Sequence, residues 1–186
     1  MTKLLTGILA LALSVSGCAY LPNNVSRSEE GIDGVACMGN VVNAVPGLVE
    51  AGNSPLQAKA QLSTGKGGVC SAKVFSVTAP VVLYRVFDAS NPRSKFGSWW
   101  SLKRPSGSRD DYRAANAICK QWSNLDRLIS CEVRPGTQIV AGTTQSAECN
   151  DGSTYAKTAE NQVFVANDGR AGILHVGACS EEAVWP

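Results

Sequence analysis

A continuous apolar run from Leu4 to Val15 opens the chain, and Lys3 is the one charge before it. About 12 apolar residues are fewer than the ~20 that cross a bilayer core, so the run predicts a secretory signal and not a membrane span. Small residues follow at Ser16 and Gly17, and Cys18 comes directly after them. The pattern predicts a signal peptide over residues 1–17 and a mature chain that begins at Cys18.

Beyond the signal, runs of β-branched and aromatic residues predict strands. The sequence of residues 74–87 is VFSVTAPVVLYRVF, and Pro80 interrupts it, so we expect two strands with residues 82–87 the stronger. Further strands are expected over residues 128–133, 138–141, 162–166 and 172–177. Pro135-Gly136 suits the centre of a type II turn, which predicts a hairpin between the strands on either side of it.

Helical spacing of apolar residues predicts a helix over residues 108–125. Ser108 can cap it, and Asp110 and Asp111 would lie in the positive first turn. A shorter helix is predicted over residues 41–51, with residues 56–62 as its continuation after a break. The sequence GKGG at residues 65–68 lacks the spacing of a phosphate-binding loop and predicts a flexible turn.

The remaining composition is that of a globular protein, with 44% apolar residues. Residues 18–34 are polar, rich in turn formers and predicted to be a loose tether after a lipid-bearing Cys18. Residues 35–186 are predicted to form a single α+β domain of short antiparallel strands and one or two helices. Without Lys3 the chain has 16 Lys+Arg against 15 Asp+Glu, a formal charge of about +1, which excludes typical nucleic-acid binders.

Six cysteines follow Cys18, an even number that predicts three disulfides in an exported protein. The sequence leaves their connectivity open, and nearest-in-sequence pairing predicts Cys37–Cys70, Cys119–Cys131 and Cys149–Cys179. A zinc site would need close cysteine pairs or histidines, but the chain has no CxxC motif and a single histidine. No metal site is therefore expected.

The segment Val15-Ser16-Gly17-Cys18 resembles the bacterial lipobox. The resemblance implies that the Cys18 thiol receives a diacylglyceryl group, that the peptide before it is removed, and that the new amino terminus is acylated, for instance with palmitate. The domain would then be tethered to a lipid bilayer through acylated Cys18. Ala19 stands where an aspartate would resemble an inner-membrane retention signal, so the resemblance favours the outer membrane, with the domain on its periplasmic or surface face.

Five features in order resemble the small toxin domains of the ADP-ribosyltransferase-like superfamily, including members that hydrolyse NAD. They are the Tyr-Arg-Val run around Arg85, the Trp-Trp-Ser run ending at Trp100 and Ser101, the capped helix, the hairpin expected at residues 134–137, and Gln162 late in the chain. The resemblance covers residues 82–166. It implies that Arg85 contacts the dinucleotide and that Ser101 and Gln162 complete the catalytic set, with Gln162 facing the ribose. By its chemistry, Trp100 beside them can pack on a flat ring of the dinucleotide.

The residue types also support the hypothesis of NAD hydrolysis on chemical grounds. Nicotinamide leaves NAD as a neutral molecule, so breaking its bond to ribose depends mainly on positioning and electrostatics. Arg85 can hold a pyrophosphate through charge-assisted bonds, but Gln162 cannot offer a negative charge to the developing cation. Glutamine at this place therefore favours hydrolysis, with NAD as substrate and no resident cofactor. The alternative is a non-catalytic envelope lipoprotein that binds a protein partner or a cell-wall component.

Overall fold

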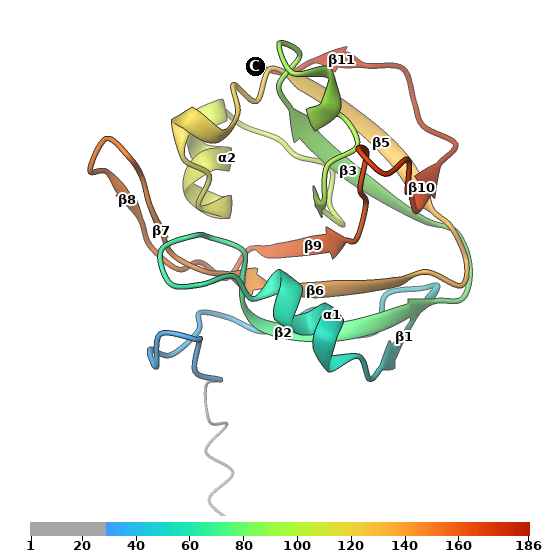
Figure 1. The fold of residues 1–186 in the computed structure, drawn as a ribbon, viewed down its shortest axis with the longest axis horizontal. Helices are drawn as coiled ribbons and strands as arrows, with labels where there is room; N and C mark the ends of the chain where they lie inside the picture. Colours follow the sequence, from blue (N-terminus) through green and yellow to red (C-terminus); the bar gives the residue numbers. More distant parts are fainter. Residues whose placement is uncertain (1–28) are drawn as a thin grey trace, which may run out of the picture.

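A computed structural model describes residues 29–186 (Figure 1). It has an α+β fold made of short antiparallel strands and two α-helices, as predicted. The helices and 3-10 turns are α1 (Ser54–Ala60), α2 (Arg109–Asn116), η1 (Pro92–Ser94) and η2 (Lys120–Trp122). The strands are β1 (Leu48–Ala51), β2 (Val69–Val77), β3 (Val81–Phe87), β4 (Trp99–Trp100), β5 (Arg127–Val133), β6 (Gln138–Thr144), β7 (Ala147–Glu148), β8 (Thr154–Tyr155), β9 (Asn161–Val165), β10 (Val176–Gly177) and β11 (Ala183–Val184).

Two antiparallel sheets form the body of the domain. The first has the order β1-β2-β6-β9-β4, and in the second β5 pairs with β3, β10 and β11. A backbone bridge between Tyr84 in β3 and Ser101 just after β4 joins the two sheets at one edge. In Figure 1, β9, β6 and β2 lie side by side, β3 and β5 run above them, and α2 lies to one side.

The main core fills the space between the two sheets. Its members are almost completely buried and come from alternate positions of facing strands, as expected for sheets with one inward face. Its largest fully buried side chains are Leu83, Trp100, Val77, Ile129, Val133, Ile139, Val163 and Val165. Valine and isoleucine dominate the set, so burial of these side chains supports the strand assignments made from the sequence.

The chain crosses between the two main sheets five times, and one of these crossings corrects a prediction. The strands before and after Pro135-Gly136 exist, but the predicted hairpin is wrong because β5 and β6 belong to different sheets. The expected turn does form, since the N–H of Thr137 donates to Arg134 O at 3.2 Å. The N–H of Gly136 then donates to Val77 O at 2.8 Å, which directs the next strand onto β2 instead of back onto β5.

Helix α2 begins as predicted and ends earlier than predicted. The Ser108 side chain accepts from the backbone N–H of Asp111, and the Asp111 carboxylate accepts from Ser108 in return, which makes a capping box. Its hydrogen bonds to Ser108 lower the pKa of Asp111. The predicted end at residue 125 is wrong because Ala117 adopts a left-handed conformation with φ 48°. The buried Arg113 then binds the carbonyls that follow the helix.

The predicted helix over residues 41–51 is also wrong. Gly47 has φ 81°, a conformation that suits glycine, and it turns the chain into β1, which pairs with β2. The predicted continuation over residues 56–62 corresponds to α1, which Asn53 caps by accepting from the N–H of Leu56. The two strands on either side of Pro80 and the strand near residues 162–166 are confirmed, whereas residues 172–177 contribute only the two residues of β10.

All six cysteines of the described chain form disulfides. Cys37–Cys70 is confirmed, but the other two predicted pairs are wrong, since the structure joins Cys119 to Cys149 and Cys131 to Cys179. Cys131 lies within β5, and β10 pairs with that strand immediately before Cys179. Cys119 instead follows α2 and packs with Cys149 in a small separate cluster. The packing of the folded chain, and not distance along the sequence, therefore selects the partners.

The signal peptide and Cys18 lie outside the described residues. The last part of the expected tether, residues 29–34, is not loose but lies against the domain. Glu30 pairs with Ala36, and the Asp33 carboxylate accepts from Lys157 Nζ at 2.7 Å. Its hydrogen bond to Lys157 lowers the pKa of Asp33. In residues 29–186, no helix has the length and apolar content needed to cross a membrane.

Candidate ligand-binding site

A cleft of about 340 Å³ lies where β3, β4 and β9 meet the end of α2 and the loop before β2. Its size falls at the lower end of the range for small-molecule sites. The lining residues include two cations, two tryptophans and two amides, and none of them is acidic. They are Leu62, Lys66, Gly68, Arg85, Val86, Trp99, Asn116, Ala117, Ile118, Trp122, Ser123, Leu125 and Gln162.

Arg85 enters the cleft from β3, with two of its nitrogens fixed by backbone carbonyls. Nε donates to Ser94 O at 2.7 Å, and Nη1 donates to Trp99 O. Burial lowers its pKa to about 10, and it stays protonated at neutral pH. Within residues 29–186 the remaining nitrogen, Nη2, has no hydrogen-bond partner, yet it is not among the fully enclosed unpartnered atoms. The guanidinium is therefore held in place with one nitrogen free of hydrogen bonds, and this nitrogen lies next to Gly97.

Gln162 enters the same cleft from β9, and its side chain is also fixed. It is 6% exposed, and Nε2 donates to Asn116 O and Thr144 Oγ1 at 3.0 Å each. Its oxygen, Oε1, has no hydrogen-bond partner among the described residues and is not fully enclosed. The amide thus offers a free acceptor to the cleft, while its nitrogen sets its orientation.

Sequence reasoning missed Lys66, which adds a second positive charge to the cleft. The loop that carries it is pinned and not a flexible turn as predicted. The N–H of Gly67 donates to Ser146 O at 3.1 Å, and the N–H of Gln145 donates to Gly68 O at 3.0 Å. The glycines permit this course, because Gly67 and Gly68 have φ of 73° and 82°. A lysine between glycines was a visible signal, but the cleft beside it was not.

The tryptophan pair divides between the core and the cleft. Trp100 is 2% exposed in the main core and donates from its ring nitrogen to Gly97 O at 2.8 Å. Trp99 points the other way, meets the edge of Phe164 with ring centroids 5.2 Å apart, and lines the cleft. Trp122, which is 45% exposed, adds a second indole to the cleft. An aromatic contact with a ligand therefore falls to Trp99 and Trp122 in this geometry, and Trp100 lies behind them.

Ser101 lies apart from the other predicted site residues. It is 4% exposed, its backbone pairs with Tyr84, and its Oγ is 3.5 Å from Tyr112 Oη. It lines a separate cavity of about 230 Å³ that shares Asn116 with the cleft. Burial raises the pKa of Tyr112. The structure thus brings Arg85 and Gln162 together and leaves Ser101 in the neighbouring cavity.

The wall formed by residues 117–125 is fixed from behind. Arg113 is 5% exposed and donates to Cys119 O at 3.3 Å and to Ser123 O at 2.6 Å, and the Cys119–Cys149 disulfide anchors the same segment. Ala117 and Leu125, both in the cleft lining, have positive φ of 48° and 54°. Non-glycine residues in this conformation are uncommon and gather at functional sites. No group of histidine, cysteine or carboxylate side chains in residues 29–186 is arranged to hold a metal ion.

Comparisons with known proteins give one structural similarity and no match in sequence. No protein-family model matches this chain, and no curated protein matches it. A chain in the solved structure of Tne2 in complex with Tni2 is similar, with 16% sequence identity and a TM-score of 0.46. The match covers 66% of this chain and 97% of the other.

Proposed function

We propose that the cleft binds NAD and hydrolyses it to nicotinamide and ADP-ribose. One observation carries the proposal: Arg85 and Gln162 come from strands far apart in the sequence, yet they line the same cleft, each with one polar atom free. These are two of the residues that the resemblance to ADP-ribosyltransferase-like domains assigns to dinucleotide binding and catalysis. The proposal assigns the aromatic contact to Trp99 in place of Trp100.

The charge and shape of the cleft suit such a ligand. Lys66 and Arg85 are the charged residues of the lining, and a pyrophosphate carries the opposite charge. The free Nη2 of Arg85 can donate to a phosphate oxygen, because its other nitrogens are already bound to carbonyls. Trp99 and Trp122 offer flat apolar surfaces for a nicotinamide or adenine ring. The absence of carboxylates from the lining also avoids repulsion of the phosphates.

The reaction needs little acid or base. As the bond between the nicotinamide nitrogen and ribose C1′ breaks, its electron pair goes to the ring, which leaves as neutral nicotinamide. A water oxygen bonds to C1′ and releases one proton to solvent, so NAD and water give ADP-ribose, nicotinamide and a proton. The free Oε1 of Gln162 can accept a hydrogen bond from that water or from a ribose hydroxyl. This bond would orient the water toward C1′, and such positioning lowers the activation barrier.

The test uses the purified chain with its disulfides formed. Calorimetric titration with NAD should show binding, and chromatography should show nicotinamide release. Gln162→Ala should lower turnover about a hundredfold, because the attacking water loses its orientation, while binding changes less. Gln121→Ala is the matched control, since Gln121 is exposed and lies outside the cleft.

A second variant, at an exposed residue, separates a loss of binding from a loss of the fold. Lys66 is exposed, so Lys66→Ala should leave the fold intact and weaken NAD binding roughly fivefold through lost attraction to phosphate, a change of about 1 kcal/mol. Lys59→Ala removes the same charge from an exposed site outside the cleft and should leave NAD binding unchanged.

Binding of NAD without release of nicotinamide would make the domain a nucleotide sensor. Neither binding nor release at millimolar NAD would reject the proposal in favour of a non-catalytic envelope lipoprotein that binds a partner.

The proposed location follows from the first residues of the chain. The apolar run and the small residues before Cys18 support lipid attachment at that thiol and tethering to the outer membrane of the envelope. Radiolabelled palmitate should enter the wild-type chain in its bacterial host and should not enter Cys18→Ser, which should leave the membrane fraction. Cys37→Ser serves as the matched cysteine control and should keep the label. Label retained in Cys18→Ser would refute the anchor.

A further inference from the structure

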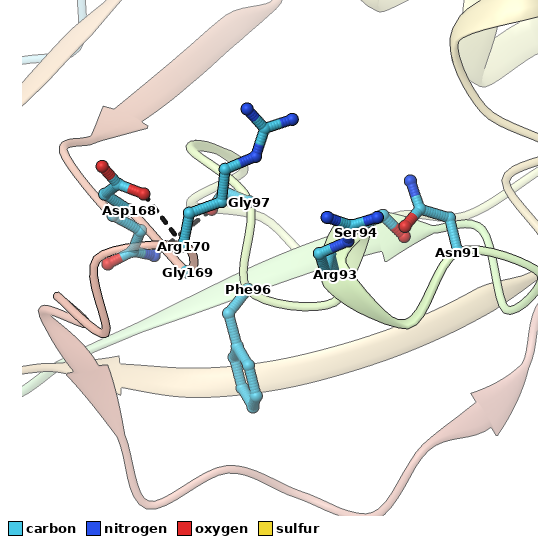
Figure 2. A pocket seen from close by; sticks show the side chains of 9 residues that line it. Asn91, Arg93, Ser94, Phe96, Gly97, Asp168, Gly169 and Arg170 are labelled. Carbon is cyan, nitrogen blue, oxygen red and sulfur yellow. Dashed lines mark hydrogen bonds between the residues drawn. The ribbon is translucent and has the colours of Figure 1, made fainter.

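A second, larger hollow of about 480 Å³ lies elsewhere on the domain and shares no lining residue with the cleft (Figure 2). One wall is the segment before β4, and the other is the loop after β9. Its lining residues are Asn91, Arg93, Ser94, Phe96, Gly97, Asn167, Asp168, Gly169 and Arg170. Figure 2 shows Arg93 and Arg170 coming from these two segments, with Phe96 pointing away from both. Residues distant in sequence therefore contribute cations to one hollow.

The frame of the hollow is fixed by Asn167. Its Nδ2 donates to Gly97 O at 3.2 Å on one wall, and its Oδ1 accepts from the N–H of His175 at 2.8 Å on the other. On the opposite side, Ser94 O accepts from Arg85 Nε at 2.7 Å. The segment before β4 is thus bonded to β3, and the loop after β9 is bonded to that segment, so the backbone around Arg93 and Arg170 is positioned before any ligand binds.

Neither arginine has an ionic partner within residues 29–186. The ion pairs of this part of the chain do not include Arg93 or Arg170, and both side chains are exposed. Asp168 also lines the hollow, but its Oδ1 accepts from the N–H groups of Arg170 and Ala171 at 2.9 Å and 3.1 Å. The carboxylate therefore shapes the turn that carries Arg170, and the charged side chains of the hollow sum to one positive charge.

We propose that this hollow is a binding site for the phosphate monoester of a small soluble molecule. Two guanidinium groups that line one hollow repel each other, and a dianion bound in the hollow would reduce the repulsion and accept from either or both. Guanidinium groups match phosphate geometry with paired hydrogen bonds, and the volume leaves room for an organic group attached to the phosphate. Asn91 can donate to a hydroxyl of that group. The proposal is independent of NAD hydrolysis in the cleft.

The experiment is a titration of the full chain with inorganic phosphate and glycerol phosphate, followed by amide chemical shifts in ¹⁵N spectra. The amides of Gly169 and Arg170 should shift with a millimolar dissociation constant, and those of Lys66 and Gly68 should report any separate binding in the cleft. Arg93→Ala and Arg170→Ala should each weaken binding about tenfold, the loss of one charge-assisted contact. Arg134→Ala is the matched control, because Arg134 is an exposed arginine outside both sites.

The Asp168→Asn variant tests whether removal of a negative charge raises the affinity for phosphate. The asparagine oxygen can still accept from the two N–H groups of the turn, so the loop keeps its shape, while the removal of a negative charge should tighten phosphate binding severalfold. A role of Asp168 in structure alone would leave the affinity unchanged. Absence of shifts at Gly169 and Arg170 up to about 10 mM phosphate, several times the expected dissociation constant, would overturn the proposal. Equal affinity in the Arg93→Ala/Arg170→Ala double variant would overturn it as well.

Discussion

Replacing Trp100 with alanine is expected to lower the free energy of unfolding by about 3–5 kcal/mol, the range for a buried tryptophan. Trp100 is 2% exposed in the core between the sheets and donates to Gly97 O, so the variant loses both packing and a hydrogen bond. Domains of this size are stable by about 5–15 kcal/mol, so the loss is a large part of the total. Urea denaturation followed by circular dichroism, with the disulfides intact, measures it.

Trp99→Ala provides the comparison at the next position. Trp99 is only partly buried and meets Phe164 at its edge, which predicts a stability loss of roughly 1 kcal/mol. NAD binding should instead fall, because the indole lines the cleft. If Trp100→Ala left the unfolding midpoint near that of the wild type, the assignment of Trp100 to the core would be wrong.

Arg85→Ala is expected to weaken NAD binding about a hundredfold, roughly 3 kcal/mol, because a partly buried charge-assisted contact is lost. Stability should also fall, since the carbonyls of Ser94 and Trp99 lose their donor. Arg85→Lys separates the two effects: it keeps the charge but cannot reach two carbonyls and a phosphate with one ammonium group. Calorimetric titration and urea denaturation on the same samples give both quantities.

Arg127 supplies the matched control for Arg85. It lies on the adjacent strand β5, opposite Phe87, is similarly half-buried, and does not line the cleft. Arg127→Ala should therefore leave NAD binding unchanged. If Arg85→Lys bound NAD as tightly as the wild type, the oriented Nη2 donor of the guanidinium would not be part of the binding site, and simple charge attraction would suffice.

The sequence contained enough information for the strands but not for their pairing. Runs such as Val81–Phe87 are β-branched and aromatic, so their conformation is evident from local composition. Pairing depends on which faces bury one another across the whole chain, and the Pro135-Gly136 turn is compatible with either a hairpin or a crossing between sheets. The same limit explains the disulfides, because Cys131 and Cys179 meet only once β10 has paired with β5.

The residues of the candidate site were likewise predictable only in part. Arg85 and Gln162 could be selected from their residue types and order, and the structure places both in one cleft. Lys66 and Trp122 could not be assigned to the cleft, because the positions of the loop that carries Lys66 and of the short 3-10 helix that carries Trp122 are set by contacts distant in sequence. The early end of α2 was hidden for a related reason: Ala117 takes a left-handed conformation that local propensity disfavours.

The disulfides divide the described chain into two covalently closed parts. The loops closed by Cys119–Cys149 and Cys131–Cys179 overlap in sequence, so one backbone cut anywhere between residues 119 and 179 leaves all pieces attached. Residues 71–118 lie in no disulfide loop, and they include Arg85 and the exposed basic residues Arg93 and Lys103. A single trypsin cut after Arg93 would therefore place Arg85 and Gln162 on separate molecules. Proteolysis in this one stretch can dismantle the cleft while every disulfide stays intact.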